Sequence, residues 1–565
     1  MAKSIIFDNL TGFLEQIAND HSEKILTLEN EMANLVYAPL SSSYGSTIRQ
    51  TQAYQLLREC FKVAEDTFSN IAGQYGVDPW LSMLRRFPPC NYRVSGWEFY
   101  VTIGLLRYSA QNIDSTFGKY KSETQFGIGL MMTMEQVFDA FRLDSLANLM
   151  ARIASVKRWI GKGAKLRPSS QNPTYYIVSE DVKESVLKYE RRRQKKTILA
   201  DEGFFINISK MESGFPLLLL RRCGSNARIH EPKQNILLLM HYYPIITDAQ
   251  PVFKLLCAYE EPIYDIFDVS VEAISHVLYA VSLLTLTTFP SIHSANKDRI
   301  ELEPHDGSRE YQHRLDFLFG ICQRAFLRFD RNHWIQRLSE ITSPWATDQE
   351  KGKLLTEEFF NGFVTGSELS NLNLSILRPI PYVFSSSSDE IYIDLTATVD
   401  FLAWILERAK EWYSTQHGDR FTLTLKKWIE SQTKARVISW KKFIGSGNEK
   451  KEADLLVHSG SSLFSIECKA FRKSRNFFRG DSSEISYRRN RIKKAVQQSK
   501  ETVAVIQNAL KFGNERLPAV ESVEAVVCTP TQEYLIPFDE YGMLTDNIPR
   551  VCTPEELIQV LNRKF

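Results

Sequence analysis

Hydrophobic positions along this chain recur with two different periods, and the dominant period changes from region to region. In residues 1–165, segments such as 51–76 and 133–161 space apolar residues by three and four, which predicts amphipathic helices. In residues 166–395, strand-like runs appear, namely TYYIVS, GFFINIS, FPLLLLRRC and NILLLMHYYPII, and YQHRLDFLFGICQRAFLRF predicts a helix. We therefore expect a largely α-helical N-terminal region followed by an α+β middle region.

The pattern changes again near residue 395. Just before it, LRPIPYVFSSSSDEIYIDL predicts two strands around a run of serines, and directly after it TATVDFLAWILERAKEWYSTQ continues as a helix. Next come a helix at 418–433, the strand ARVISWKKF, a hairpin at 450–471, a basic helix at 484–511 and the strand SVEAVVCTP. Strands interleaved with helices indicate an α/β layer domain at 396–565, with a mixed central sheet flanked by helices.

Composition narrows the class of protein. A chain of 565 residues is too long for one hydrophobic core, and 69 Lys and Arg against 67 Asp and Glu leave the overall charge uninformative about partners. The eight cysteines form no CxxC pair, which disfavours a zinc cluster and a secreted disulfide framework. The N-terminus lacks a signal-peptide pattern, and the uncharged stretch 273–296 is too polar for a bilayer span, so we expect a buried helix there and a cytoplasmic protein without membrane contact.

The hairpin at 450–471, KKEADLLVHSGSSLFSIECKAF, carries charged residues on otherwise apolar strands. In its second strand the period of two places Glu467 and Lys469 on one face, and Ile466 and Cys468 on the other. An acidic residue two positions before a lysine also occurs elsewhere in the chain, but only this pair lies on an apolar strand. The context therefore singles it out.

Asp454 begins the first strand of the same hairpin. Because the start of one strand neighbours the end of the next in an antiparallel pair, we expect Asp454 and Glu467 to meet. Two nearby carboxylates repel each other unless a positive charge lies between them, and Mg²⁺ is typically held by one or two carboxylates, waters and phosphate oxygens. Mn²⁺ can substitute for it. With Lys469 to position water and share developing charge, these groups are suited to phosphodiester hydrolysis.

The spacing of Asp454, Glu467, Cys468 and Lys469 resembles that of the PD-(D/E)xK nuclease superfamily, the restriction-endonuclease-like fold. The resemblance covers about residues 400–565. It implies that the aspartate and the glutamate bind the metal and that the lysine assists attack on the scissile phosphate. The alternative for these side chains is a structural ion pair at the edge of the hairpin.

The chain departs from the superfamily pattern at two positions. Ala453 stands where the motif has its proline, and Thr422 follows Phe421 where the preceding helix often carries an acidic metal ligand. Glu430 on the same helix is the replacement that we expect to bind the metal, with Asp419 as a weaker candidate. The superfamily also often places a glutamine in the helix after the lysine, where Gln497 and Gln498 fit.

A basic segment with interspersed aromatic residues follows the lysine directly. A cationic loop and helix beside a cleavage site could hold a phosphate backbone while aromatic rings stack on bases, although a solvated helix face has the same composition. Two further basic stretches, 156–167 and 188–196, could extend that surface. The residues expected to bind nucleic acid are Arg472, Lys473, Arg475, Arg479, Arg488, Arg489, Arg491, Lys493 and Gln498, and Lys494 continues the series.

The sequence thus predicts a Mg²⁺-dependent nuclease that acts on DNA in preference to RNA. By analogy with large restriction and anti-phage proteins of bacteria, residues 1–395 would recognise a substrate, a partner protein or a signal, or form a homo-oligomer. The alternative, motivated by Thr422, is a catalytically inactive protein that keeps the nuclease fold and binds nucleic acid or acts as a scaffold.

Overall fold

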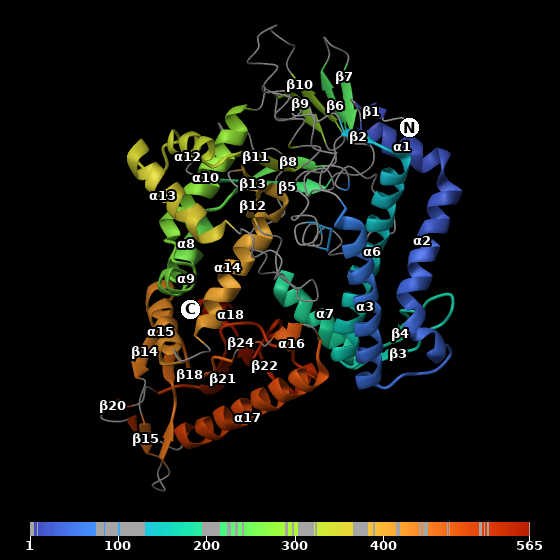
Figure 1. Ribbon diagram of the computed structural model, residues 1–565. Coiled ribbons are helices and arrows are strands. Elements are labelled where there is room, and N and C mark those ends of the chain that lie inside the picture. The colour runs from blue at the N-terminus through green and yellow to red at the C-terminus, as the bar shows by residue number, and fades with distance from the viewer. Residues whose placement is uncertain are drawn as a thin grey trace.

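The computed structural model describes most of residues 5–74, 130–194, 215–302, 325–364, 382–507 and 511–563, with short gaps inside these ranges and a few isolated positions between them. The protein combines helices with several small sheets (Figure 1). The expected mixture of helix and sheet is therefore confirmed.

The first region is built on long helices that lie side by side (Figure 1). Both segments chosen by their period form single helices, and the longer one begins with a reciprocal cap between Thr133 and Gln136. Short strands and the helix α7 continue this packing beyond the boundary expected at residue 165. The elements are β1 (Ile5–Phe7), α1 (Leu10–Asp20), α2 (Ser22–Tyr37), a 3₁₀ turn (Ala38–Ser43), α3 (Gln50–Ala72), β2 (Leu130–Met132), α6 (Met134–Gly161), β3 (Lys165–Leu166), β4 (Tyr176–Ile177) and α7 (Glu180–Gln194).

The middle region contains three small sheets and a group of helices, which confirms its mixed character. One sheet pairs β5 (Pro216–Arg222) with β8 (Tyr242–Asp248). The second has the strand order β7 (Ile236–Leu239), β6 (Arg228–Glu231), β10 (Arg299–Leu302) and β9 (Ile292–Asn296). The third has the strand order β11 (Phe326–Asp330), β13 (Glu390–Asp394) and β12 (Val383–Ser387). The helices are α8 (Gln250–Ala258), α9 (Glu260–Phe267), α10 (Val271–Thr288), α12 (Arg331–Ser339) and α13 (Gln349–Phe363).

Several expectations for the middle region need correction. The end of the helix predicted by YQHRLDFLFGICQRAFLRF is the strand β11, because its residues pair with β13 along their whole length. NILLLMHYYPII divides into two strands of different sheets, and TYYIVS contributes only the two residues of β4. The run GFFINIS lies outside the described residues.

The first helix after residue 395, α14 (Thr398–Trp412), packs on the middle region. Phe401 stacks on Tyr382 with ring centroids 5.1 Å apart, and Trp404 contacts Phe267 at 5.0 Å. A core of buried apolar side chains continues from the N-terminal helices through the middle region into the C-terminal one. The three regions therefore fold against one another.

A five-stranded sheet organises the C-terminal region. Its order is β14 (Arg436–Ser439), β17 (Leu455–Ser459), β18 (Ser462–Cys468), β21 (Ser522–Cys528) and β24 (Val551–Cys552). The first three strands are antiparallel neighbours, whereas β21 runs parallel to β18 and β24 parallel to β21. The predicted strand ARVISWKKF divides between β14 and β15 (Lys442–Ile444), which pairs with β16 (Lys450–Glu452) outside this sheet.

Helices cover both faces of this sheet (Figure 1). On one face α17 (Ser482–Gln507), the predicted basic helix, buries Val505 and Ile506 against Leu456 and Leu463. On the other, α15 (Gly418–Gln432) and α18 (Pro554–Arg563) belong to the same core as Leu455 and the strand-alternate residues of β18. The long chain segment between β18 and β21 is thus a crossover that contains α17, as parallel strands require.

The turn between β17 and β18 depends on a glycine. Ser459 pairs with Ser462, so only Gly460 and Ser461 connect the two strands. Gly460 has φ of +58°, which a residue with a side chain adopts at a steric penalty and which matches the twist of a two-residue hairpin. This turn sets the register that places Asp454 beside the end of β18.

A buried ion pair joins the N-terminal helices to the C-terminal region. Arg192 on α7 donates to both carboxylate oxygens of Glu556 on α18, each at 3.0 Å, and also donates to the carbonyl oxygen of Val551 at 3.1 Å. Both charged residues are 6% exposed. The basic stretch 188–196 therefore contributes a structural contact at Arg192.

A second contact joins α6 to the loop before α17. A side chain at Gly161 would place its Cβ 1.9 Å from the carbonyl oxygen of Gly480. Gly480 itself has φ of +81°, and a Cβ there would lie 2.7 Å from the carbonyl oxygen of Lys157. The two backbones approach this closely because neither position has a side chain.

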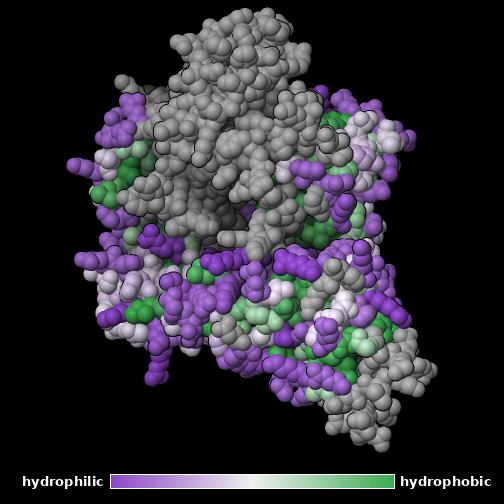
Figure 2. Space-filling view, turned by 180° about the vertical axis from the view of Figure 1, so that it is seen from behind, coloured by the Kyte–Doolittle hydropathy of each residue, from purple (hydrophilic) through white to green (hydrophobic). Residues whose placement is uncertain are grey.

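No single helix in the described part of the chain is long and apolar enough to cross a membrane, but the bent pair Glu260–Phe267 and Val271–Thr285 together meet that length and composition. These helices meet at 87°, and α10 buries residues such as Ile274 and Val277 in the protein core. The face seen in Figure 2 is mainly hydrophilic where it is described, with apolar residues in separate patches.

Replacing Arg192 by alanine should destabilise the protein strongly. The substitution leaves the Glu556 carboxylate buried without its partner, so we expect the free energy of unfolding to fall by about 3–5 kcal/mol in urea denaturation. Arg191→Ala removes an adjacent but exposed arginine and should change stability little. Equal effects of the two variants would contradict the importance of the pair.

Candidate active site at the end of strand β18

Asp454 and Glu467 lie side by side at the junction of β17 and β18. The register pairs Leu455 with Ile466, so one further step brings Asp454 opposite Glu467. Asp454 is fixed by its Oδ2 atom, which accepts a hydrogen bond of 2.7 Å from the backbone N–H of Cys468. The register thus brings Asp454 and Glu467 opposite each other, as expected for this hairpin.

Lys469 joins the two carboxylates at the end of the strand. Its Nζ donates to Oε1 of Glu467 at 2.5 Å, and its backbone N–H donates to the carbonyl oxygen of Cys528 at 2.9 Å. The side chain of Glu467 is 5% exposed and that of Lys469 is 27% exposed. The ammonium group therefore lies between a buried carboxylate and solvent.

Alternation along β18 confirms the predicted faces. Phe464, Ile466 and Cys468 pack into the main core on the side of α15 and α18. Glu467 and Lys469 interact with each other and are not part of that core. The apolar face thus anchors the strand, while the other face presents the charged groups.

Burial raises the pKa of both carboxyl groups above their ordinary values. For Asp454 the charges of Glu452 and Asp419 add to this rise, whereas the Cys468 N–H and Lys469 oppose it. For Glu467 burial is again the largest cause, the hydrogen bond from Lys469 opposes it, and the charge of Asp454 raises the pKa further. Ionised carboxylates here are disfavoured and would be stabilised by added positive charge.

Helix α15 brings Asp419, rather than Glu430, within electrostatic range of Asp454. Glu430 is exposed and forms an ion pair of 3.8 Å with Lys426 on its own helix. Since the two acids are eleven positions apart, they extend from opposite ends of the helix, and the end that approaches the hairpin is the N-terminal one. The prediction of Glu430 as a metal ligand therefore gains no support from its position.

Thr422 lies where the superfamily pattern has an acidic residue. Its side chain hydrogen-bonds the thiol of Cys468, which partly offsets the rise that burial causes in the pKa of that thiol. Helix α15 therefore contacts β18 through a neutral group at this position, and the contact brings no charge to the carboxylates.

Within the described residues, no group of three or more His, Cys, Asp or Glu side chains is arranged to hold a metal ion. The donors at the end of β18 are the two carboxylates of Asp454 and Glu467. Such a pair fits Mg²⁺, which commonly takes only one or two protein carboxylates and fills its remaining positions with water and phosphate oxygens.

Two of the cations expected to bind nucleic acid are buried. Arg488 donates from Nε and Nη2 to the carboxylate of Glu533, both at 2.5 Å, and from Nη2 to the carbonyl oxygen of Phe471 at 3.0 Å. Lys473 is 6% exposed, with its Nζ 5.7 Å from the ring centre of Phe477. The partners of Arg488 satisfy its buried charge. Through its bond to Phe471, Arg488 also holds in place the chain segment that follows Lys469.

The other predicted cations take different positions. Lys493 pairs with Glu540 at 2.5 Å, and Arg489 interacts with the hydroxyl of Tyr541. Arg475 begins the short helix α16 (Arg475–Phe478). Arg472 and Arg479 lie outside the described residues.

One face of α17 remains available to a ligand. Arg491, Lys494 and Gln498 are exposed and recur at intervals of three and four on this helix. The guanidinium of Arg491 lies 4.2 Å from the ring centre of Phe471 and 5.7 Å from that of Tyr487, which is 60% exposed. We call Arg491, Lys494, Gln498 and Tyr487 the α17 surface.

Sequence reasoning missed the acidic partners of this site. Glu533 follows β21 in a loop, and its link to Arg488 spans 45 positions. Glu452 raises the pKa of Asp454 but lies in β16, outside the main sheet. No local period or motif marks either residue, so only the tertiary arrangement identifies them.

Asp454→Asn should stabilise the metal-free protein at neutral pH. A carboxyl whose pKa is raised on folding supports the folded state fully below the unfolded value, near 3.8, and loses that contribution as pH rises through the folded pKa. Asparagine keeps an acceptor for the Cys468 N–H without the charge, so we expect a gain of about 0.5–2 kcal/mol in urea denaturation.

The stability gain of Asp454→Asn should shrink as the pH falls towards the pKa of the unfolded carboxyl, near 3.8. Asp546→Asn, at an exposed position, serves as the matched control and should leave stability unchanged. A destabilised Asp454→Asn protein at neutral pH would show that the ionised carboxylate is a net structural contact.

Searches with this chain against protein-family models, curated proteins and solved structures gave no significant match.

Proposed function

We propose that the C-terminal region is a metal-dependent nuclease domain that hydrolyses phosphodiester bonds, preferably in DNA. The observation that carries the proposal is the placement of Asp454, Glu467 and Lys469 around the end of β18, with the Glu467 carboxylate buried, Asp454 partly buried and the Lys469 side chain 27% exposed. A purely structural ion pair needs one acid and one base, whereas this site holds a second acid beside the first.

The topology of the region supports a restriction-endonuclease-like fold. Helix α15 precedes three antiparallel strands, α17 follows, and β21 then joins the sheet parallel to β18. This is the order expected from the resemblance of the hairpin motif to the PD-(D/E)xK superfamily. The fold and the motif therefore point to the same class of enzyme, although they are separate observations.

The site residues suggest a division of roles. Asp454 and Glu467 would hold Mg²⁺ or Mn²⁺, and Asp419 is placed to bind it through water better than Glu430 is. The ion would polarise the scissile phosphate and activate water. Lys469 would orient the attacking water and stabilise charge that develops on the phosphate, because its ammonium lies at the solvent side of Glu467.

The α17 surface is the proposed contact for the nucleic-acid backbone. Arg491 packs on the buried ring of Phe471, which is only two residues beyond Lys469. The exposed Arg491 and the exposed ring of Tyr487 beside it therefore lie near the chain that leaves the proposed cleavage site. Cations bind phosphates of any sequence, and exposed aromatic rings stack on bases. A strand held here would continue towards the end of β18. In a bacterial cell such an enzyme would suit restriction or anti-phage defence.

A second candidate function is that of a binding or scaffold protein with a nuclease fold and no activity. Thr422 favours it, because a neutral side chain contacts Cys468 where an acidic ligand is expected. The same assay separates the two functions.

Purified protein should nick or linearise plasmid DNA when Mg²⁺ or Mn²⁺ is added. Lys469→Ala should lower the rate by about 10²–10³-fold, since it removes one stabilising donor, and Asp454→Ala should reduce it to background. Lys434→Ala changes an exposed lysine and should retain activity.

Melting curves of the same variants establish that each is folded. Absence of cleavage of DNA by folded wild-type protein, with salt-sensitive DNA binding retained, would support the scaffold function. A parallel reaction on RNA identifies the preferred nucleic acid, and greater activity there would overturn the preference for DNA.

The double change Arg491→Gln and Lys494→Gln should weaken DNA binding without altering the fold. Each lost phosphate contact should reduce the slope of log affinity against log salt by about one. Fluorescence anisotropy with labelled duplexes measures this slope. Lys427→Gln, an exposed lysine on α15, is the matched control, and an equal loss in that variant would exclude a specific α17 surface.

A further inference from the structure

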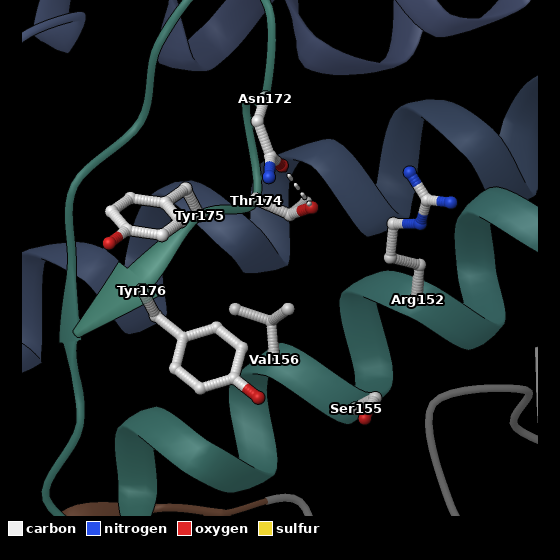
Figure 3. A pocket seen from close by; sticks show the side chains of 7 residues that line it. All are labelled: Arg152, Ser155, Val156, Asn172, Thr174, Tyr175 and Tyr176. Atoms are coloured by element: carbon white, nitrogen blue, oxygen red, sulfur yellow. Dashed lines mark hydrogen bonds between the residues drawn. The ribbon is translucent and has the colours of Figure 1, made fainter. Parts of the chain in front are cut away.

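A pocket of about 600 Å³ lies between α6 and the β3–β4 segment of the N-terminal region (Figure 3). Helix α6 contributes one side, and the chain that enters and forms β4 contributes the other. None of the side chains proposed for catalysis lines it. The lining residues are Arg152, Ser155, Val156, Asn172, Thr174, Tyr175 and Tyr176.

The polar wall of this pocket is preformed. The backbone N–H of Asn172 donates to Oγ of Ser169 at 3.0 Å, and the backbone carbonyl of Asn172 accepts from the Tyr175 N–H at 3.2 Å. The Thr174 hydroxyl donates to Oδ1 of Asn172 at 3.4 Å, and Thr174 is 6% exposed. The loop therefore holds an amide and a hydroxyl in fixed positions before any ligand binds.

Two tyrosines form the aromatic side. Tyr176 stacks on Trp159 with centroids 5.6 Å apart and planes at 25°, which fixes its ring against α6. Tyr175 lines the same cavity and is 49% exposed. In Figure 3 both rings lie on one side of the pocket and Arg152 lies on the other, with Asn172 and Thr174 between them.

The charge opposite the tyrosines is available for a ligand. Arg152 is exposed and makes no ion pair with a residue that the structure describes. Its guanidinium can therefore pair with an anion that enters the pocket.

We propose that this pocket binds a nucleoside phosphate. Its volume falls in the range of small-molecule sites. A planar base would stack on Tyr175, a phosphate would bind Arg152, and the amide and hydroxyls of Asn172, Thr174 and Ser155 would meet the sugar or the base edge. An inorganic anion would leave the aromatic side unused.

The same chemistry has two sources, a free nucleotide or the phosphorylated end of a strand. Isothermal titration of the full chain with adenosine, guanosine, cytidine and uridine 5′-monophosphates tests the first. Titration with short 5′-phosphorylated oligonucleotides tests the second, in the Arg491→Gln, Lys494→Gln background so that the α17 surface does not contribute.

Arg152→Gln and Tyr175→Ala should each weaken binding by about ten-fold or more, and Tyr175→Phe should retain it because the ring is kept. Arg58→Gln, an exposed arginine on α3 outside the pocket, should have no effect. Melting curves confirm that the variants fold. The site does not depend on catalysis, so loss of nuclease activity in Lys469→Ala leaves this test unchanged.

Either source of ligand supports the pocket, provided that its binding depends on Arg152 and Tyr175. Two results would overturn the proposal. One is the absence of binding of every monophosphate and every phosphorylated oligonucleotide by folded protein. The other is binding of inorganic phosphate as tight as that of the nucleotides, which would mean that the base makes no contact.

Discussion

Strand β18 is bonded on both sides, antiparallel to β17 and parallel to β21, and the candidate site depends on this double constraint. The antiparallel side brings Asp454 to the end of the strand, where the Cys468 N–H fixes its carboxylate. The parallel side continues through the Lys469 N–H to Cys528, so the strand direction is maintained past the last carboxylate. A central strand held in this way gives its terminal side chains little freedom, as a preorganised site requires.

The stabilising and functional demands on the hairpin oppose each other. Its alternate residues anchor it in the apolar core, whereas Glu467 is buried with a carboxylate neighbour and a raised pKa. Lys469 offsets the rise in pKa only in part, because burial remains the largest influence on the pKa of both Asp454 and Glu467. Carboxyl groups with a raised pKa are common where a protein binds cations or performs acid–base chemistry.

Local pattern was sufficient for the hairpin and for the long helices. The period of two separated Glu467 and Lys469 from Ile466 and Cys468, and the period of three and four located α3 and α6. These features are encoded within a few residues of one another. Sequence therefore predicted the elements, and the hairpin geometry predicted which charged side chains would meet.

Pattern failed where distant segments decide the outcome. The sequence pattern predicts that Arg488 belongs to a basic surface, but in the structure Arg488 is buried and pairs with Glu533, 45 positions later. Phe326 to Asp330 follow a helical pattern but form β11, because β13 offers a complete strand partner. Likewise, nothing within α15 shows whether its first or its last turn approaches Asp454. These choices depend on which surfaces the fold brings together.

The ion pair between Arg192 and Glu556 joins residues 364 positions apart. During synthesis the α7 guanidinium therefore does not meet this carboxylate until α18 has followed the strands of the five-stranded sheet out of the ribosome. The contact that ties the N-terminal helices to the C-terminal region is consequently made only after those strands have been synthesised.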